Sequence, residues 1–390
     1  MKWVPTSYVQ LTERMLTNRT TTLTFDDFSS DPIPLSNGTT QGCCLSMLFY
    51  GFYNAPLFDL PPLPNETLSG FVDDAAYLGI GHSVPEAHNV IRNMMSRPHG
   101  AFDWSTSHNS PFELSKLVLM NFPRPYANDP EALRPLSLPK PNPTADSTEQ
   151  TIHPAASHRY LSLIFDPKLR WNLHHSKVLA SAVLWTTQVA RLGRQKIGLP
   201  PEKIRRLYLS VAMPRITYAA DIWYTPVSPS ESNPTSRSGS VRIAQKLGAI
   251  QRRALITLSG ALRSTASDLL ETHANILPMH LALNKACCRS AIRLASLPPS
   301  HPLFKTVIRA ASRYVKSHRS PLHEIFHFSK LTPSHTEKIL PSRFCPNFTP
   351  AVSTSIASSR HQATSDAKKL HLTHNVRVFS DGSMYIPLPR

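Results

Sequence analysis

Two adjacent carboxylates, Asp73 and Asp74, follow the apolar dipeptide Phe71-Val72. The surrounding residues, Thr67 to Ile80, predict two short strands that turn at this pair. Carboxylates fixed at such a turn can bind hard divalent cations such as Mg²⁺, which often combine one or two protein carboxylates with substrate phosphates. The dipeptide is also ordinary turn chemistry, because aspartate side chains bond to nearby backbone. Taken alone, the pair is compatible with a metal site and with a plain turn.

The elements that must hold this turn predict an α+β fold. In order, they are a hairpin over Thr20–Leu35 that turns at residues 29–32, a buried helix over Gln41–Ala55 that Pro56 stops, an amphipathic helix over Val84–Met95, and strands over Lys116–Phe122 and Tyr160–Phe165. Residues 123–154, between the last two strands, are rich in proline and polar side chains and predict a loop or insertion.

Helical periodicity dominates after residue 170. The predicted helices are Trp171–Gly193, Pro201–Trp223, Val241–Leu258 and Met279–Leu297. Residues 226–240 are rich in serine and proline and predict a loop. Residues 320–373 show weak periodicity and predict a linker, and Val376–Ser380 predicts one more strand.

Several short blocks of the sequence resemble the reverse transcriptases of non-LTR retrotransposons, fungal elements in particular. The blocks are Gln41-Gly42 with Asn54-Ala55-Pro56-Leu57, then Phe71-Val72-Asp73-Asp74, Lys116–Phe122, a segment similar to the primer grip at Arg159–Leu169, Gly198-Leu199-Pro200, Tyr218-Ala219-Ala220, Gln251–Leu255 and Leu297–Pro302. They follow one another in the family's order from about Thr20 to Leu303. A last block, Val378–Ser383, is similar to the first strand of a ribonuclease H domain.

This resemblance implies a domain organisation and an activity. The implied parts are a partial palm over residues 1–170 (an antiparallel sheet with helices, containing the insertion at about 123–154), a helical thumb or connection region over 171–319, a linker over 320–375, and the start of a ribonuclease H domain over 376–390. The implied activity is RNA-directed DNA synthesis, in which two Mg²⁺ ions clamp the attacking and leaving oxygens.

The resemblance also implies roles for single residues. The metal ligands would be Asp73, with Asp74 as its partner, and Asp381 in the ribonuclease H part; Gln41 and Gly42 would face the nucleotide or template; Lys116 would be a positive charge near the phosphates.

The chain departs from the family pattern in ways that bear on activity. The family's first metal-binding aspartate, on an earlier strand, has no counterpart before Gln41, and Asp26-Asp27 is a poor candidate for it. Ser162 stands where the primer grip has a glycine that lets the backbone approach the primer closely. We therefore expect an inactive polymerase fragment. We also expect no ribonuclease H activity, because the carboxylates that would follow Asp381 are missing.

The charge of the chain favours nucleic acid as a partner. Lysine and arginine number 42 against 25 acidic residues, a net charge of +17, which attracts polyanions. The candidate nucleic-acid-binding residues are Arg191, Arg194, Lys196, Arg205, Arg206, Arg252 and Arg253. We expect reversal of the last four to weaken binding and, if they are surface residues, to leave the melting temperature nearly unchanged. The alternatives are solvated helix faces, a non-catalytic nucleic-acid-binding remnant, and an unfolded product without activity.

Other classes of protein find little support in the sequence. The most apolar stretch, residues 43–63, is broken by prolines, so we expect no membrane span. The N-terminus has no apolar signal, and the five cysteines have neither zinc nor disulfide spacing. We expect an intracellular protein, nuclear or cytoplasmic. His174-His175 and His371-x-x-His374 are interpreted as surface histidines, and Trp185, Trp223 and Tyr224 as core residues.

Overall fold

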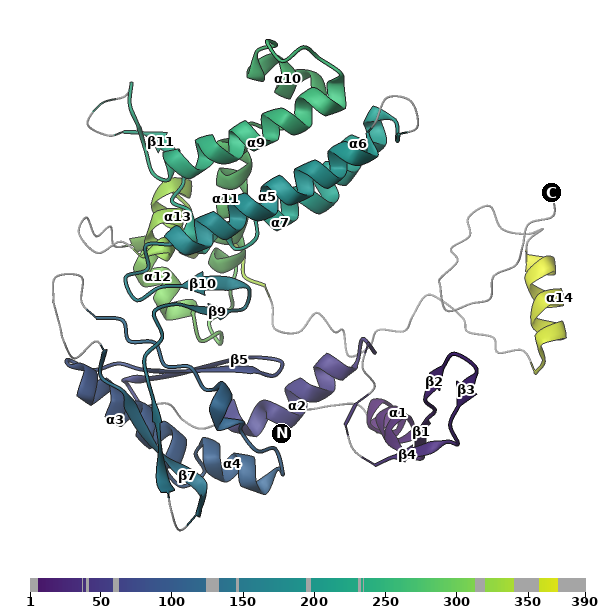
Figure 1. Ribbon diagram of the computed structural model, residues 1–390, viewed down its shortest axis with the longest axis vertical. Coiled ribbons are helices and arrows are strands. Elements are labelled where there is room, and N and C mark those ends of the chain that lie inside the picture. Colours follow the sequence, from purple (N-terminus) through teal and green to yellow (C-terminus); the bar gives the residue numbers. More distant parts are fainter. Residues whose placement is uncertain are drawn as a thin grey trace.

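The computed structural model describes residues 6–36, 38–39, 42–58, 63–123, 133–144, 147–193, 198–230, 233, 235–312, 320–339 and 358–370. These residues form an α+β chain, as predicted, in which every sheet is an antiparallel pair of strands. Figure 1 shows three groups of elements: α1 with β1–β4, then the pairs β5–β6 and β7–β8 with α2–α4, and the helices from α5 to α13. No helix in the described ranges is long and apolar enough to cross a membrane.

The first group is small and exposes its apolar side chains. It consists of α1 (Thr6–Leu16), β1 (Arg19–Thr21) paired with β4 (Ile33–Leu35), and β2 (Thr24–Phe25) paired with β3 (Phe28–Ser29). The predicted hairpin is present, but it turns at Asp26-Asp27, where Asp26 has a φ of 49°, and not at residues 29–32. Aspartate tolerates the left-handed conformation, which suits it to this position.

The helix before the carboxylate pair differs from the prediction. α2 (Ser46–Phe58) begins four residues after Gly42 and continues through Pro56. The proline lies in the last turn, where it removes the bond to the carbonyl four residues earlier, and the helix ends two residues beyond it. The helix is apolar but buries only Asn54 and Leu57 fully, so the expectation of a buried helix was wrong.

The second group packs around one apolar cluster. Its elements are β5 (Glu66–Phe71), β6 (Asp74–Gly79), α3 (Val84–Ser96), α4 (Ala101–Ser107), β7 (Leu136–Thr144) and β8 (Ser147–Ile152). The predicted hairpin at Asp73-Asp74 and the amphipathic helix are confirmed. Leu57, Met95 and Trp104 are buried in the cluster. At its edge the carboxylate of Glu66, almost fully buried, pairs with Arg97 at 2.9 Å.

Two predictions between these elements were wrong. Residues 116–122 do not form a strand: Leu114–Lys116 is a 3₁₀ turn, and Leu119 makes only an isolated bridge to Pro154. The proline-rich stretch is not all loop, because β7 and β8 pair within it as antiparallel strands. Both strands are edge strands, where a missing N–H donor is tolerated.

The third group is helical and has its own core. Its helices are α5 (Asn172–Leu192), α6 (Pro201–Leu207), a π turn (Tyr208–Ala212), α7 (Met213–Ile216), α8 (Ala220–Trp223), α9 (Val241–Ser259), α10 (Ser267–Ala274), α11 (Met279–Ala295), α12 (Phe304–Ser312) and α13 (Pro321–Ser329). The single helix predicted over Pro201–Trp223 is broken. Pro214 lacks the N–H that an unbroken helix needs, and Ala219 has a φ of 50°. Short strands β11 (Ser228–Pro229) and β12 (Arg237–Ser238) pair within the predicted loop.

The core of this group corrects two further expectations. His174 is 3% exposed and is not a surface residue, while His371 and His374 lie outside the described ranges. The linker does not begin at residue 320, because Ile325 and Phe326 of α13 are buried in the main cluster beside Trp223 and Tyr224. The prediction that Trp223 and Tyr224 are core residues is confirmed.

The described part of the helical group ends in a strap, residues 333–339. Lys338 donates from Nζ to the carbonyl of Ala295 at 2.6 Å and to that of Pro333, and lies over the ring of Phe304. Ile339 adds a backbone bond to Ser296 at 2.7 Å. The strap fastens this segment to the end of α11. Beyond it, the described residues include α14 (Arg360–Leu370).

Candidate active site

The carboxylate turn has a constrained backbone. Phe71 pairs with Asp74, so Val72 and Asp73 form a two-residue loop. Val72 has a φ of 54°, a conformation that costs a non-glycine residue about 1–2 kcal/mol. The side chain of Asn54, on α2, donates to the carbonyl of Val72 at 2.8 Å. The turn is therefore held from α2, with both aspartates exposed.

A second tight turn belongs to the hairpin of β9 (His158–Tyr160) and β10 (Leu163–Phe165). The two turn residues, Leu161 and Ser162, have φ values of 45° and 68°, the pattern of a type I′ turn, which favours glycine or asparagine. Side chains of the helical group bind both of their carbonyls. Tyr218 donates from its hydroxyl to Leu161 at 3.1 Å, and Lys177 from Nζ to Ser162 at 2.5 Å.

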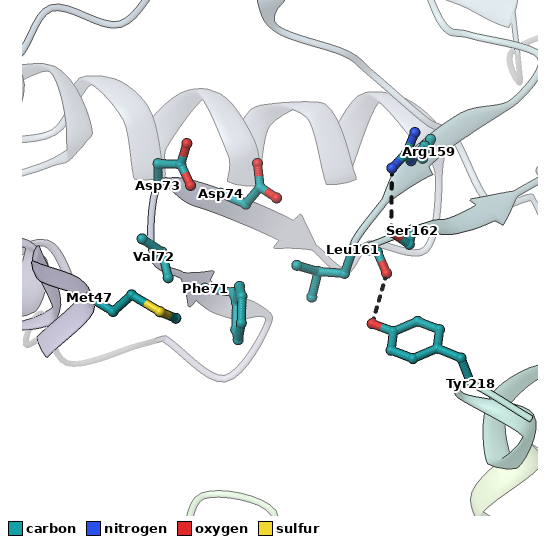
Figure 2. A pocket seen from close by; sticks show the side chains of 9 residues that line it. All are labelled: Met47, Phe71, Val72, Asp73, Asp74, Arg159, Leu161, Ser162 and Tyr218. Atoms are coloured by element: carbon teal, nitrogen blue, oxygen red, sulfur yellow. Dashed lines mark hydrogen bonds between the residues drawn. The ribbon is translucent and has the colours of Figure 1, made fainter. Parts of the chain in front are cut away.

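The two turns face a common cavity of about 480 Å³. Figure 2 shows Asp73 and Asp74 on one side and the Leu161-Ser162 turn with Arg159 on the other. The lining residues are Met47, Phe71, Val72, Asp73, Asp74, Arg159, Leu161, Ser162 and Tyr218. Four segments distant in the sequence thus contribute to one space.

The cavity has an acidic and a basic wall. Among the described residues, the carboxylates of Asp73 and Asp74 accept no hydrogen bond and form no ion pair. Arg159 makes one long side-chain bond, from Nη2 to the hydroxyl of Ser162 at 3.4 Å. The pKa of Lys177 is lowered, first by burial and then by the positive charge of Arg159.

The donor set fits a hard cation only in part. Two free, adjacent carboxylates suit one Mg²⁺ whose remaining positions are taken by water and substrate phosphates. In the described ranges no third acidic, histidine or cysteine side chain joins them to form a group that could enclose a metal ion. Asp73 and Asp74 are the residues that would hold the ion.

Of the other residues proposed for the site, the structure describes Gly42 and Lys116, and neither lines the cavity. Gly42 is in a turn before α2, with a φ of 88°, and Gln41 and Asp381 lie outside the described residues. Lys116 does not line the cavity. It forms an exposed ion pair with Glu113, and the hydrogen bond from Lys116 lowers the pKa of Glu113.

Sequence reasoning gave no role to three lining residues. Arg159 and Tyr218 stand inside blocks quoted for the resemblance, directly before the tyrosine of the hairpin and at the start of Tyr-Ala-Ala. Their positions inside these blocks could have indicated that both residues lie at the site. Met47 projects from α2 and carried no such signal.

The basic candidates fall into two kinds. Arg205 donates to the carbonyls of Ala274 and Asn275 at 2.6 and 2.7 Å, and Arg252 donates to Ser267 and to the carbonyl of Arg263 at 2.9 and 2.7 Å. These two arginines anchor the ends of the α10 segment. Arg205 and Arg252 are half-buried and not simple surface residues, so we expect their reversal to lower stability.

The second kind consists of arginines whose side chains have no partner within the described residues. Arg191, Arg206 and Arg253 are exposed, and none of their side chains makes a hydrogen bond or ion pair among the described residues. Arg194 and Lys196 lie outside the described ranges. The three free arginines are available to an external anion.

Comparison with known proteins adds no relative: no family model matches the chain, no curated protein does, and no solved structure does.

Proposed function

We propose that this chain contributes the carboxylate turn and the primer-grip hairpin of a reverse-transcriptase active site. The observation that carries the proposal is the shared cavity: the Asp73-Asp74 turn, the Leu161-Ser162 turn and Tyr218 meet in one space of about 480 Å³. The resemblance relates these segments to the metal turn, the primer grip and the thumb region. If the likeness of these short blocks were due to chance, nothing would predict that the three segments line one cavity.

Mg²⁺ bound by Asp73 and Asp74 would supply electrostatic stabilisation of the attacking and leaving oxygens during nucleotidyl transfer. The chain's own residues would position the substrates. The Leu161-Ser162 turn forms the opposite wall, and Arg159 places a fixed positive charge there. Preorganised charge of this kind stabilises phosphate oxygens without reorganisation during the reaction.

Metal-directed cleavage tests the assignment without requiring turnover. Fe²⁺ replaces Mg²⁺, and ascorbate with peroxide generates radicals that cut the backbone near the bound ion. We expect cuts near residues 72–74 and 160–162 that excess Mg²⁺ suppresses and that Asp73→Asn abolishes. Asp103→Asn, on α4 and outside the cavity lining, is the matched control. Cuts elsewhere, or cuts indifferent to Asp73→Asn, would reject the site.

Primer extension tests the second half of the proposal, that this site is incomplete. Two carboxylates do not make the full two-metal site, so the chain with primed RNA, nucleotides and Mg²⁺ should give no extension above the Asp73→Asn background. Robust extension that Asp73→Asn removes would show a complete polymerase. Asp26 or Asp27 would then be the first residues to test for the missing ligand.

A non-catalytic nucleic-acid-binding remnant is the second candidate. The observation that favours it is the set of free arginines, Arg191, Arg206 and Arg253, in a chain of net charge +17. Side chains without internal partners can neutralise backbone phosphates, which gives salt-dependent binding without sequence preference. Fluorescence anisotropy with duplex or hybrid at several salt concentrations measures this function separately from metal binding.

A further inference from the structure

His174 joins the hairpin to the helical group. It is the third residue of α5 and is 3% exposed. The backbone N–H of Ile164, on β10, donates to its Nδ1 at 3.3 Å. Nδ1 must be unprotonated to accept this bond, so the neutral ring carries its proton on Nε2. Nε2 is buried and has no hydrogen-bond partner among the described residues.

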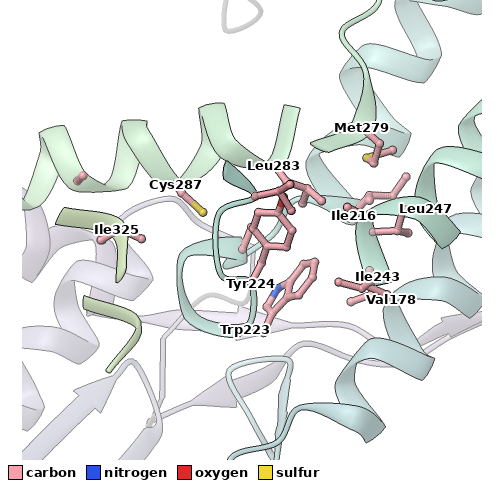
Figure 3. Packing of buried hydrophobic residues seen from close by; sticks show 14 of the residues in the cluster. Val178, Ile216, Trp223, Tyr224, Ile243, Leu247, Met279, Leu283, Cys287 and Ile325 are labelled. Carbon is pink, nitrogen blue, oxygen red and sulfur yellow. The ribbon is translucent and has the colours of Figure 1, made fainter. Parts of the chain in front are cut away.

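The surroundings of the ring are apolar and aromatic. Its centroid lies 6.3 Å from that of Trp171 and 5.6 Å from that of Trp223. Trp223 is part of the main helical core, where Figure 3 shows it beside Tyr224 and near Val178 and Ile243. An imidazolium here would lose hydration and gain no acceptor.

We propose that His174 is an acid-sensitive latch that holds the β9–β10 hairpin, and with it the Leu161-Ser162 turn, against the helical group. Protonation of Nδ1 turns the acceptor into a donor that faces the N–H of Ile164. Neither donor then has a partner, and the charged ring is favoured only when it reaches water. The hairpin must therefore separate from α5 for the proton to be accommodated.

The groups around the ring also disfavour its protonation. The ring contacts β10 and α8, and the titratable groups on the hairpin, in the loop after it and near the ring on α5 and α8 are His158, Arg159, Tyr160, Asp166, His175, Lys177 and Asp221. Asp166 already accepts from the backbone N–H groups of Lys168, Arg170 and Trp171. Burial first, then the charges of Lys177 and His175, lower the pKa of His174 to about 4.

The sign of the pH effect follows from this lowered pKa. The latch is intact above the pKa of a free histidine, about 6.5, and is lost as pH falls from there toward 4. Between pH 7 and pH 5 the released fraction should rise roughly 20-fold, given a pKa of about 4 when latched and about 6.5 when released. This inference uses only contacts of the fold, so it survives or fails independently of the proposed polymerase ancestry.

Hydrogen exchange measured by mass spectrometry tests the latch. After correction for the intrinsic pH dependence, protection of peptides covering 158–165 should fall roughly 20-fold between pH 7 and pH 5, while α9 peptides stay protected. His174→Asn keeps an acceptor near the position of Nδ1 but cannot be protonated, so it should abolish the fall. His175→Gln, which preserves the bond to the carbonyl of Trp223, should retain it.

Two results would overturn the proposal. One is protection that stays constant to pH 5 in the wild type, and the other is an equal fall in His174→Asn. Should His174→Asn fail to fold, ¹⁵N NMR of the wild-type histidines replaces it. The His174 ring should be protonated on Nε2 at pH 7 and should gain its second proton together with the loss of protection; protonation without that loss rejects the latch.

Discussion

Replacement of Ser162 by glycine tests whether the second turn of the cavity is strained. Ser162 has a φ of 68°, and the left-handed conformation costs a non-glycine residue about 1–2 kcal/mol. Glycine removes this cost but adds about 0.5–1 kcal/mol of backbone entropy loss on folding. The bond to the hydroxyl of Ser162, 3.4 Å long, contributes little. Ser162→Gly should therefore stabilise the hairpin by a net amount of roughly 0.5–1 kcal/mol.

Urea unfolding followed by tryptophan fluorescence measures this gain, because Trp171 and Trp223 lie beside the hairpin's anchor, His174. The midpoint should rise by roughly 0.3 M at an unchanged slope. Ser162→Ala keeps the Cβ atom and should give no gain. Ser176→Gly, on the exposed side of α5, should cost about 0.5–1 kcal/mol. If Ser162→Gly lowers the midpoint as much as Ser176→Gly does, the turn is not limited by backbone strain.

Three further predictions use other parts of the chain. Reversal of Arg191, Arg206 and Arg253 to glutamate should reduce the steepness of log affinity against log salt from about 4–5 to about 2, at an unchanged melting temperature. Arg205→Met or Arg252→Met should instead cost about 1–3 kcal/mol of stability, with a small change in slope. Fluorescence anisotropy measures the slope and thermal melts measure the stability; an affinity that does not depend on salt would contradict the reasoning. Glu66→Gln should destabilise by roughly 3 kcal/mol, because it removes the buried negative charge that pairs with Arg97. Glu113→Gln at the exposed pair should change stability little. Equal urea midpoints for the two variants would refute the difference. Cys287 is buried, and burial raises the pKa of its thiol to about 12. A disulfide reagent should therefore modify Cys287 only after unfolding, while the exposed Cys44 should react in the folded chain. Modification of Cys287 in the folded chain, detected by peptide mapping, would contradict this.

Residues with a local signal were predictable from the sequence. The apolar residues on both sides of the turn residues Asp73 and Asp74 predicted the hairpin, and the periodicity of residues 84–95 predicted α3. The long helices α5, α9 and α11 begin and end within two residues of their predicted limits. Their apolar faces are long enough for periodicity to be unambiguous.

What the sequence could not give depends on contacts between distant segments. The prolines after residue 136 led to the prediction of a loop, whereas β7 and β8 form a hairpin in which the alternate residues Leu136 and Leu138 are buried in the core. His174 looked like a surface residue because no local pattern records that Ile164, Trp171 and Trp223 enclose it. Arg205 and Arg206 are neighbours in sequence, but only the side chain of Arg205 donates to carbonyls at the end of α10.

The strap at Lys338 has a mechanical consequence. Among the described elements, α14 is the one that a protease or unfoldase pulling from the C-terminal side meets first, and it lies beyond the strap. The next described contacts under load are the bonds of Lys338 and Ile339 to the end of α11. The ammonium group of Lys338 joins the strap to α11 through the carbonyl of Ala295, whereas its second bond, to Pro333, lies within the strap and can persist when the strap leaves α11. Lys338→Met would remove this side-chain attachment and leave the backbone bond of Ile339 to Ser296 as the described contact that holds the strap ahead of α13.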